Sequence, residues 1–295
     1  MSKSELKVEL VDKAVAASIL PIRENSANKG SFGKALLIAG SEKYMGAGLL
    51  SLEAALRGGA GYIGFLNDPC ICDIALTKYP EAIYHRVPLT DIDSVIEISR
   101  AYTSVLIGPG LGTSEKIARL VRALISTEGA VLIIDADGLN SISKFLGKEI
   151  FKIKKREIII TPHPLEFARL IGMESADEVS VDRVGLAASF AKECGATVLL
   201  KGHGTVVTDG NKAYVNSSGS VALAKAGSGD VLAGLLASLS AFMPDKTLAA
   251  ILSAFVHGYT ADRLSSELSS FGVIPSDLPR AFAGALNELE KERKI

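Results

Sequence analysis

The chain has 295 residues, of which 48% are hydrophobic and 22% charged, a balance typical of a globular protein with a sizeable core. Its net charge of −1 indicates neither a nucleic-acid partner nor an anionic membrane surface. The longest apolar stretch, Val231 to Met243, is too short to span a bilayer, and three cysteines do not complete a zinc site. With no signal-peptide pattern at the N-terminus, we expect a cytoplasmic protein without a dedicated metal centre.

The first predicted element is a short helical lead from Val8 to Leu20, which Pro21 ends. No low-complexity segment, repeat or Pro/Gly-rich linker divides the sequence that follows. We therefore expect residues 1–295 to form a single domain, with the lead of residues 1–28 as part of it.

A repeating pattern then runs along the chain: a short apolar run, a loop rich in glycine, proline or acidic residues, and a helix. The runs cover residues 35–39, 105–107, 131–134, 158–160 and 198–200. Because these runs are wholly apolar rather than alternating, they indicate strands buried on both faces. The pattern predicts an α/β fold with a doubly wound, mostly parallel sheet flanked by helices. Residues 205–208 and 212–215, around Asp209-Gly210-Asn211, are typical of a hairpin beside that sheet.

In such sheets, ligands bind at the carboxyl ends of the strands, where the candidate residues fall. The strongest motif is Gly227-Ser228-Gly229-Asp230, followed by an apolar helix. The unpaired amides of a helix N-terminus bind anions, and Asp230 could accept a proton from a hydroxyl. The alternative, about equally favoured by the motif alone, is that Asp230 only caps the helix.

Three further loops carry candidates. Lys201-Gly202-His203-Gly204-Thr205 could form a nucleotide site, or an ordinary tight turn with an exposed lysine. Asp135 and Asp137 end a strand and could hold Mg²⁺ through water or bind polar substrate groups, or could cap a turn. His163, fixed between two prolines, could contact substrate, although a lone histidine is more often structural.

The glycine-rich segments exclude two familiar nucleotide motifs. In the segment 108–112 the third glycine comes too early for a dinucleotide fingerprint, and the correctly spaced Gly59, Gly61 and Gly64 follow a helix and open a strand. The P-loop pattern is absent from the sequence. The small-residue loop 40–48 precedes a helix, and its amides could face a second phosphate-bearing ligand.

Taken in order, these loops resemble the ADP- or ATP-dependent NAD(P)H-hydrate dehydratase family of the ribokinase-like fold. The resemblance extends from about Lys29 to the C-terminal helices. It rests on seven ordered motifs: Lys29-Gly30, the 40–47 loop, Gly108–Gly112, Asp135–Asn140, Thr161-Pro162-His163-Pro164 with Glu166, Lys201–Thr205 and Gly227–Gly234.

The resemblance implies repair of NADH or NADPH that has been hydrated at the nicotinamide ring. The ring hydroxyl of the S epimer would be phosphorylated from ADP or ATP with Mg²⁺, and loss of phosphate would restore the double bond. Asp230 would be the catalytic base, with the anion hole at Gly227, Ser228 and Gly229. The implied adenine-nucleotide residues are Lys201, Gly202, His203, Gly204, Thr205 and Gly229. The implied substrate contacts are Ala47, Gly110, Gly112, Asp137, Asn140, His163 and Asp230.

Two residues depart from the family pattern: Ser228 stands where threonine is usual, and His203 replaces a small residue. Many relatives carry an N-terminal epimerase domain, which the 28 residues before Lys29 cannot encode, so we expect that partner activity on another chain. By resemblance, we also expect a homotetramer.

Two alternatives remain open from the sequence. A ribokinase-like kinase of a small alcohol, such as a vitamin precursor, would share the Gly-x-Gly-Asp chemistry but release a stable phosphorylated product. A nucleotide-binding regulatory protein would lack turnover altogether.

Overall fold

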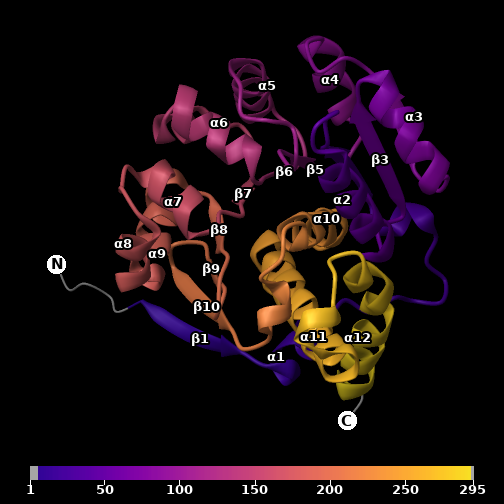
Figure 1. Cartoon of the computed structure of the whole chain (residues 1–295), viewed down its shortest axis with the longest axis vertical. Coiled ribbons are helices and arrows are strands. Elements are labelled where there is room, and N and C mark those ends of the chain that lie inside the picture. Colours follow the sequence, from indigo (N-terminus) through magenta and orange to yellow (C-terminus); the bar gives the residue numbers. More distant parts are fainter. Residues whose placement is uncertain (1–5, 294–295) are drawn as a thin grey trace.

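The computed structural model describes residues 6–293, and its strands form one ten-stranded sheet of order β1-β10-β9-β8-β7-β6-β5-β2-β3-β4 (Figure 1). The strands are β1 (Lys7–Val11), β2 (Lys34–Ile38), β3 (Tyr62–Asn67), β4 (Ile83–Arg86), β5 (Ser104–Ile107), β6 (Val131–Ile134), β7 (Ile158–Ile160), β8 (Thr197–Leu200), β9 (Val206–Thr208) and β10 (Lys212–Asn216). The α-helices are α1 (Lys13–Ile19), α2 (Met45–Arg57), α3 (Pro69–Lys78), α4 (Ile92–Ser99), α5 (Glu115–Ser126), α6 (Asp137–Phe145), α7 (Pro164–Ile171), α8 (Ala176–Val181), α9 (Arg183–Cys194), α10 (Ser228–Ser240), α11 (Lys246–Gly272) and α12 (Asp277–Arg293).

The sheet is mostly parallel, as predicted. Among the described strands, β9 alone runs against its neighbours, and it pairs antiparallel with both β8 and β10. The predicted hairpin is therefore confirmed, and it lies inside the sheet rather than beside it. All the apolar runs expected to be strands are strands.

Side chains of the central strands alternate between two hydrophobic clusters. In β2, Leu36 and Ile38 belong to one cluster, while Ala35 and Leu37 belong to the other. Helices α4–α7 and α9 cover the first face, and α1, α2, α10, α11 and α12 cover the second (Figure 1). Burial on both faces explains why these strands carry no polar alternation.

The predicted helical lead from Val8 to Leu20 is wrong in its first part. Residues up to Val11 form β1, which pairs in parallel with β10 at the edge of the sheet. The helix begins only after Asp12, whose side chain accepts a hydrogen bond from the Val15 amide at 2.9 Å. The helix ends at Ile19, just before Pro21, as predicted.

The strand order reverses at β2, which lies between β3 and β5. The chain moves outward through β3 and β4 and then returns on the other side of β2. The helices that follow β2 and β5 lie on opposite faces of the sheet, and a cavity lined by Gly40 and Leu111 lies at the carboxyl ends of these strands. Gly40 donates its amide to Pro109 O at 2.7 Å across this point, which ties the two loops together.

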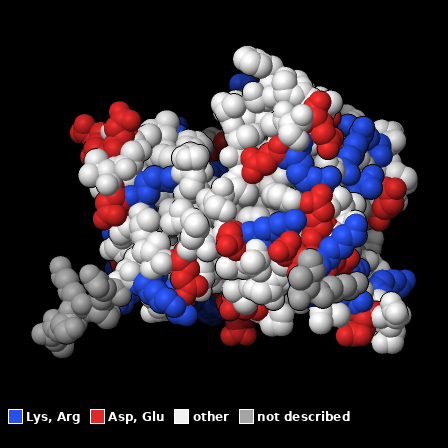
Figure 2. All heavy atoms as spheres, turned by 90° about the horizontal axis from the view of Figure 1, so that it is seen from below, with Lys and Arg blue, Asp and Glu red and all other residues white. Residues whose placement is uncertain are grey.

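One face of the molecule carries side chains of both charges. Figure 2 shows basic and acidic side chains intermixed over one side of the molecule, without a broad region of a single sign. Within residues 6–293, the helices are too short or too polar to cross a membrane.

Helix α10 packs closely against α2 because both helices carry small residues where they meet. A Cβ atom added at Gly234 would lie 2.0 Å from the carbonyl oxygen of Ser51, far inside van der Waals contact. The absence of a side chain at Gly234 therefore sets how deeply α10 can lie.

We predict that Gly234→Ala lowers the free energy of unfolding by about 1–3 kcal/mol, because overpacking forces the two helices apart. The matched control is Gly46→Ala in α2, where an added Cβ meets no atom within 4 Å. That change should be neutral or stabilising by up to about 1 kcal/mol through helix propensity. Urea denaturation measures both, and equal effects would refute the close-packing argument.

Candidate active site

The Gly227–Asp230 segment opens α10 at the carboxyl edge of the sheet. Gly227 is the N-cap residue, with φ of +100°, and a Cβ there would lie 2.6 Å from Leu50, so both conformation and space favour glycine. Asp230 lies in the first turn, and the helix has no side-chain cap hydrogen bond. The carboxylate of Asp230 therefore does not cap this helix, and the capping alternative is wrong.

The carboxyl group of Asp230 is held in an environment that disfavours its charge. Burial raises its pKa to about 7, and the negative charges of Asp135, Asp137 and Glu166 add to this effect, while Lys201 opposes it. A carboxyl group with a pKa near neutrality can exchange protons under physiological conditions, as a general base must.

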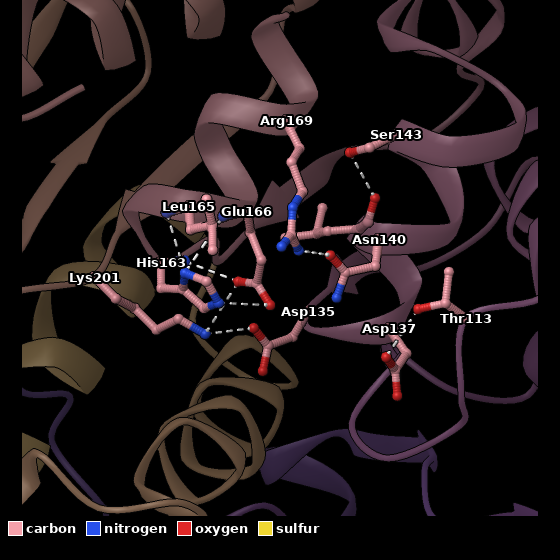
Figure 3. A network of polar contacts seen from close by, with 11 residues as sticks. Thr113, Asp135, Asp137, Asn140, Ser143, His163, Leu165, Glu166, Arg169 and Lys201 are labelled. Carbon is pink, nitrogen blue, oxygen red and sulfur yellow. Dashed lines mark hydrogen bonds and ion pairs between the residues drawn. The ribbon is translucent and has the colours of Figure 1, made fainter. Parts of the chain in front are cut away.

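Lys201 lies between two further carboxylates, those of Asp135 and Glu166 (Figure 3). Its ammonium group lies 2.7 Å from Asp135 Oδ1 and 3.9 Å from Glu166 Oε2. Burial lowers the pKa of Lys201, but the two carboxylates more than offset this and the pKa is raised. Lys201 is thus a charged centre of the site, and the alternative of an exposed lysine in a turn is wrong.

His163 caps α7 through its own ring. Nδ1 accepts hydrogen bonds from the amides of Leu165 and Glu166 at 3.2 and 3.3 Å, so the proton of the neutral ring lies on Nε2. Glu166 completes the capping box by accepting from the His163 amide at 2.8 Å. Burial lowers the pKa of His163, which keeps the ring neutral and makes Nε2 a donor.

Asp137 and Asn140 are occupied by protein partners (Figure 3). Asp137 accepts from the Gly112 amide at 2.8 Å and from the Thr113 hydroxyl at 3.1 Å. Asn140 accepts from Arg169 at 3.1 Å. Between Asp135 and Asp137, Ala136 adopts a φ of +48°, a conformation that costs a non-glycine residue energy and is concentrated at functional sites.

The 108–112 loop lies against its neighbours at two glycines. A Cβ at Gly108 would lie 1.9 Å from Asp135 O, and one at Gly110 would lie 2.7 Å from the Cβ of Ala47. The structure therefore brings together two predicted contacts: Ala47, in the first turn of α2, and Gly110, in the loop after β5.

Two adjoining cavities meet at the start of α10. The first, of about 390 Å³, is lined by Asp135, His163, Glu166 and Asp230 with the Gly227–Gly229 segment. The second, of about 440 Å³, is lined by His203, Thr205 and residues of α11. Lys201, Gly202, Ser228 and Gly229 line both. The predicted site residues that line neither cavity are Ala47, Gly110, Gly112, Asp137, Asn140 and Gly204.

Sequence reasoning missed two features of this site. Glu166 received no role, although burial raises its pKa to about 7. Its position three residues after His163 was the available signal, as in a capping box. His257, on α11, lines the second cavity, but it lies in no motif that could have drawn attention to it.

We predict that Asp230→Asn stabilises the fold at high pH. An unfolded aspartate loses its proton near pH 4, whereas Asp230 keeps its proton to about pH 7. Ionisation therefore destabilises the folded protein progressively between these values. The variant should gain on the order of 2–4 kcal/mol more at pH 8 than at pH 4, measured by urea denaturation.

Asp91→Asn is the control of opposite sign. Hydrogen bonds from Ser94 hold the pKa of Asp91 below its usual range, so that carboxylate stabilises the fold above the unfolded pKa and loses this effect as pH falls. Its replacement should therefore cost more at pH 8 than at low pH. A pH-independent effect of Asp230→Asn would contradict the burial of a charged group there.

Comparison with known proteins places this chain in a family. A family model described as NAD(P)H-hydrate dehydratase matches residues 35–282. The ADP-dependent (S)-NAD(P)H-hydrate dehydratase of Listeria monocytogenes is 33% identical over 92% of the chain and 93% of its own length. The bifunctional NAD(P)H-hydrate repair enzyme Nnr of Thermofilum pendens is 34% identical over 99% of the chain, which spans 56% of that relative's length.

A solved structure agrees. The ADP/ATP-dependent NAD(P)H-hydrate dehydratase of Bacillus subtilis, co-crystallized with ATP/Mg²⁺, superimposes with a TM-score of 0.87, at 27% identity, over 96% of this chain and 99% of that one. This match confirms the predicted ribokinase-like fold. Together with the match over residues 35–282, it follows that the chain belongs to the NAD(P)H-hydrate dehydratase family.

Proposed function

We propose that the protein repairs hydrated NADH and NADPH by dehydrating the S epimer at the expense of ADP or ATP. Family membership supports this proposal, and one observation carries it at the level of residues. The carboxylate of Asp230, with a pKa of about 7, faces the same cavity as His163, beside the N-terminus of α10. This arrangement provides a base and an anion site together.

The reaction we propose has two stages. The ring hydroxyl oxygen attacks the terminal phosphorus of the nucleotide, the bridging P–O bond breaks, and the hydroxyl proton passes to Asp230. The new phosphate ester then leaves as phosphate with its electron pair, and the neighbouring ring carbon gives up a proton to form the double bond. Phosphate is a far better leaving group than hydroxide, which explains the need for a nucleotide.

The start of α10 would hold the phosphoryl charge. The first amides of a helix have no partner within it, and the helix dipole favours an anion at this end. Within the proposed anion hole of Gly227, Ser228 and Gly229, the Ser228 amide already donates a hydrogen bond to Lys225 O at 3.2 Å. Lys201, next to Gly229, adds positive charge at the same place.

The second cavity fits the nucleotide. It opens from the shared wall at Gly229 toward the 201–205 turn, so a phosphate chain at the start of α10 would place its adenosine there. Arg183 shapes this turn by donating to the carbonyl oxygens of Leu200, Lys201 and His203 at 2.6–3.1 Å. The turn is therefore rigid before any nucleotide binds.

Mg²⁺ would be held mainly by the nucleotide phosphates. Across residues 6–293, no group of three or more acidic, histidine or cysteine side chains is arranged to hold a metal ion. Asp135 is suited to contact the ion through a water molecule. Its Oδ2 atom is buried and lacks a hydrogen-bond partner among the described residues, and its side chain lines the first cavity. When bound, the ion would neutralise phosphate charge, and Asp135 would hold one of its waters.

Substrate binding would use the other end of the crevice. The Nε2 atom of His163 lies 3.4 Å from Glu166 Oε1, so His163 would contact the hydrated ring through the exposed part of its side chain. Ala47 with Gly110 would form the wall beside it. Asp137 would act by holding Gly112 in place, as its hydrogen bond shows. Gly112 and Gly204, in the loops after β5 and β8, and Asn140, in α6, are further proposed contacts.

Two further proposals concern partners. The described strands all belong to one sheet, which supports a single domain for residues 6–293, and we propose that an epimerase acting on the R epimer is the functional partner of this domain. We also propose that the protein is a homo-oligomer, as the sequence resemblance implies. Mass measurement in solution tests the second proposal.

We predict that Asp230→Asn reduces turnover about 10²–10⁴-fold, the usual contribution of a general base, while nucleotide affinity is kept or increased. The assay contains hydrated NADH, Mg²⁺ and ADP or ATP, and follows the absorbance of reformed NADH. Asp209→Asn, in the β9–β10 hairpin, is the control and should retain activity. Near-normal turnover by Asp230→Asn would remove Asp230 from its role, and a stable phosphorylated product from the wild type would indicate a kinase.

A pH dependence follows from the same carboxyl group. Since the base must be deprotonated and its pKa is about 7, kcat/KM should fall about tenfold per pH unit below neutrality. The residual activity of Asp230→Asn should lack this fall. A wild-type profile that is flat down to about pH 5 would contradict the raised pKa.

A further inference from the structure

A third cavity lies at the carboxyl ends of β2, β3 and β5 and has no part in the proposed reaction. Its volume is about 280 Å³. The loop after β5 leads to it from the first cavity. A Cβ at Gly108 would lie 1.9 Å from the carbonyl oxygen of Asp135, which lines the first cavity, whereas Leu111 lines the third. A ligand that fills the first cavity and extends along this loop therefore reaches the third.

The third cavity is built on β2, α2 and β3, two parallel strands with the helix that connects them. Gly40 turns the chain after β2 with a φ of +87°. A Cβ at Gly48 would lie 3.1 Å from the Cα of Gly40, so α2 begins close to the end of the strand. In open α/β sheets, a glycine turn, a closely packed helix and an acidic residue after the second strand together hold the adenosine half of a dinucleotide. Here the acidic residue after β3 is Asp68.

A buried neighbour positions Asp68. Asn67 is 1% exposed, and it donates to the carbonyl oxygens of Ala39 and Gly40 at 2.7 and 2.8 Å. Its own side-chain oxygen accepts from the Asp68 amide at 2.8 Å, so the end of β3 is tied to the loop after β2. Asp68 is the N-cap residue of α3, yet its side chain makes no cap hydrogen bond. Its carboxylate is therefore available to a ligand in the cavity that it lines.

The rest of the lining suits the other parts of an adenylate. Apolar side chains provide contacts for a base, and they are Ile71, Leu89, Leu111 and Ile117. Lys43 and Lys116 line the same cavity and provide positive charge for a pyrophosphate, while Glu42 adds a second carboxylate. Ribose hydroxyls donate to carboxylates, and phosphate oxygens accept from ammonium groups. A lining of both signs thus fits a nucleotide better than it fits a simple anion.

We propose that the third cavity binds the adenosine half of the hydrated dinucleotide, with Asp68 accepting a hydrogen bond from a ribose hydroxyl. This inference rests on the proposed function, which places the hydrated ring in the first cavity and the phosphoryl donor in the second. It gives Asp68 a role in substrate affinity alone, because phosphoryl transfer takes place at Asp230.

The test compares hydrated NADH with hydrated reduced nicotinamide mononucleotide, which lacks the adenosine half, at saturating ATP with Mg²⁺. Asp68→Ala should raise KM for hydrated NADH about tenfold, the effect of losing a hydrogen bond to a charged group, and should leave kcat unchanged. KM for the mononucleotide and the dissociation constant for ATP should stay at their wild-type values. Asp73→Ala, on the same helix but outside the lining of the cavity, is the matched control and should behave as the wild type.

An unchanged KM for hydrated NADH, or an equal loss for both substrates, would overturn the inference and leave the proposed function intact. A wild-type protein that dehydrates neither substrate would overturn both.

A second measurement needs no variant. With ATP saturating, AMP should compete with hydrated NADH for the third cavity and should not compete with the hydrated mononucleotide. Competition by AMP against both substrates, or against neither, would refute the proposal.

Discussion

The site depends on one largely buried cation that is shared by carboxylates from three separate segments of the chain. Lys201 follows β8 and pairs with Asp135 after β6 at 2.7 Å, while Glu166 from α7 lies 3.9 Å away. Asp230, on α10, feels the same ammonium group. One positive charge cannot neutralise all of these carboxylates in a buried setting, so protons remain on the least stabilised ones. Burial is the main cause of the pKa values of about 7 for Glu166 and Asp230, and the excess of neighbouring negative charge adds to it.

This excess of negative charge arises because the fold places several acidic side chains at or near the carboxyl ends of apolar strands. The central strands are buried on both faces, and their carboxyl ends are the first positions where charged groups can reach a cavity. Helix α10 adds its N-terminus at the same edge, because Gly234 allows it to lie directly on α2. A base and an anion site thereby meet without either residing on a flexible loop.

Much of this arrangement could be predicted from the sequence, because local patterns determine it. Wholly apolar runs such as Val131–Ile134 predicted the parallel sheet, and the Gly227–Asp230 motif predicted the start of α10. The strand Lys7–Val11 could not be distinguished from a helix, since its identity depends on pairing with β10, about 200 residues away. For the same reason the ion pair between Lys201 and Asp135, 66 residues apart, could not be predicted. His257 carries no local signal, because only the folded chain brings it to the wall of the second cavity.

The account rests on Asp230 holding its proton until near neutrality in the folded protein. The most direct measurement is a carboxyl ¹³C NMR titration of the protein labelled at aspartate, with the Asp230 resonance assigned by its loss in Asp230→Asn. The account predicts a midpoint close to pH 7. A midpoint near 4, the value of an ordinary exposed aspartate, would show that the carboxylate is already ionised and well solvated, and the proposed proton transfer would lose its physical basis.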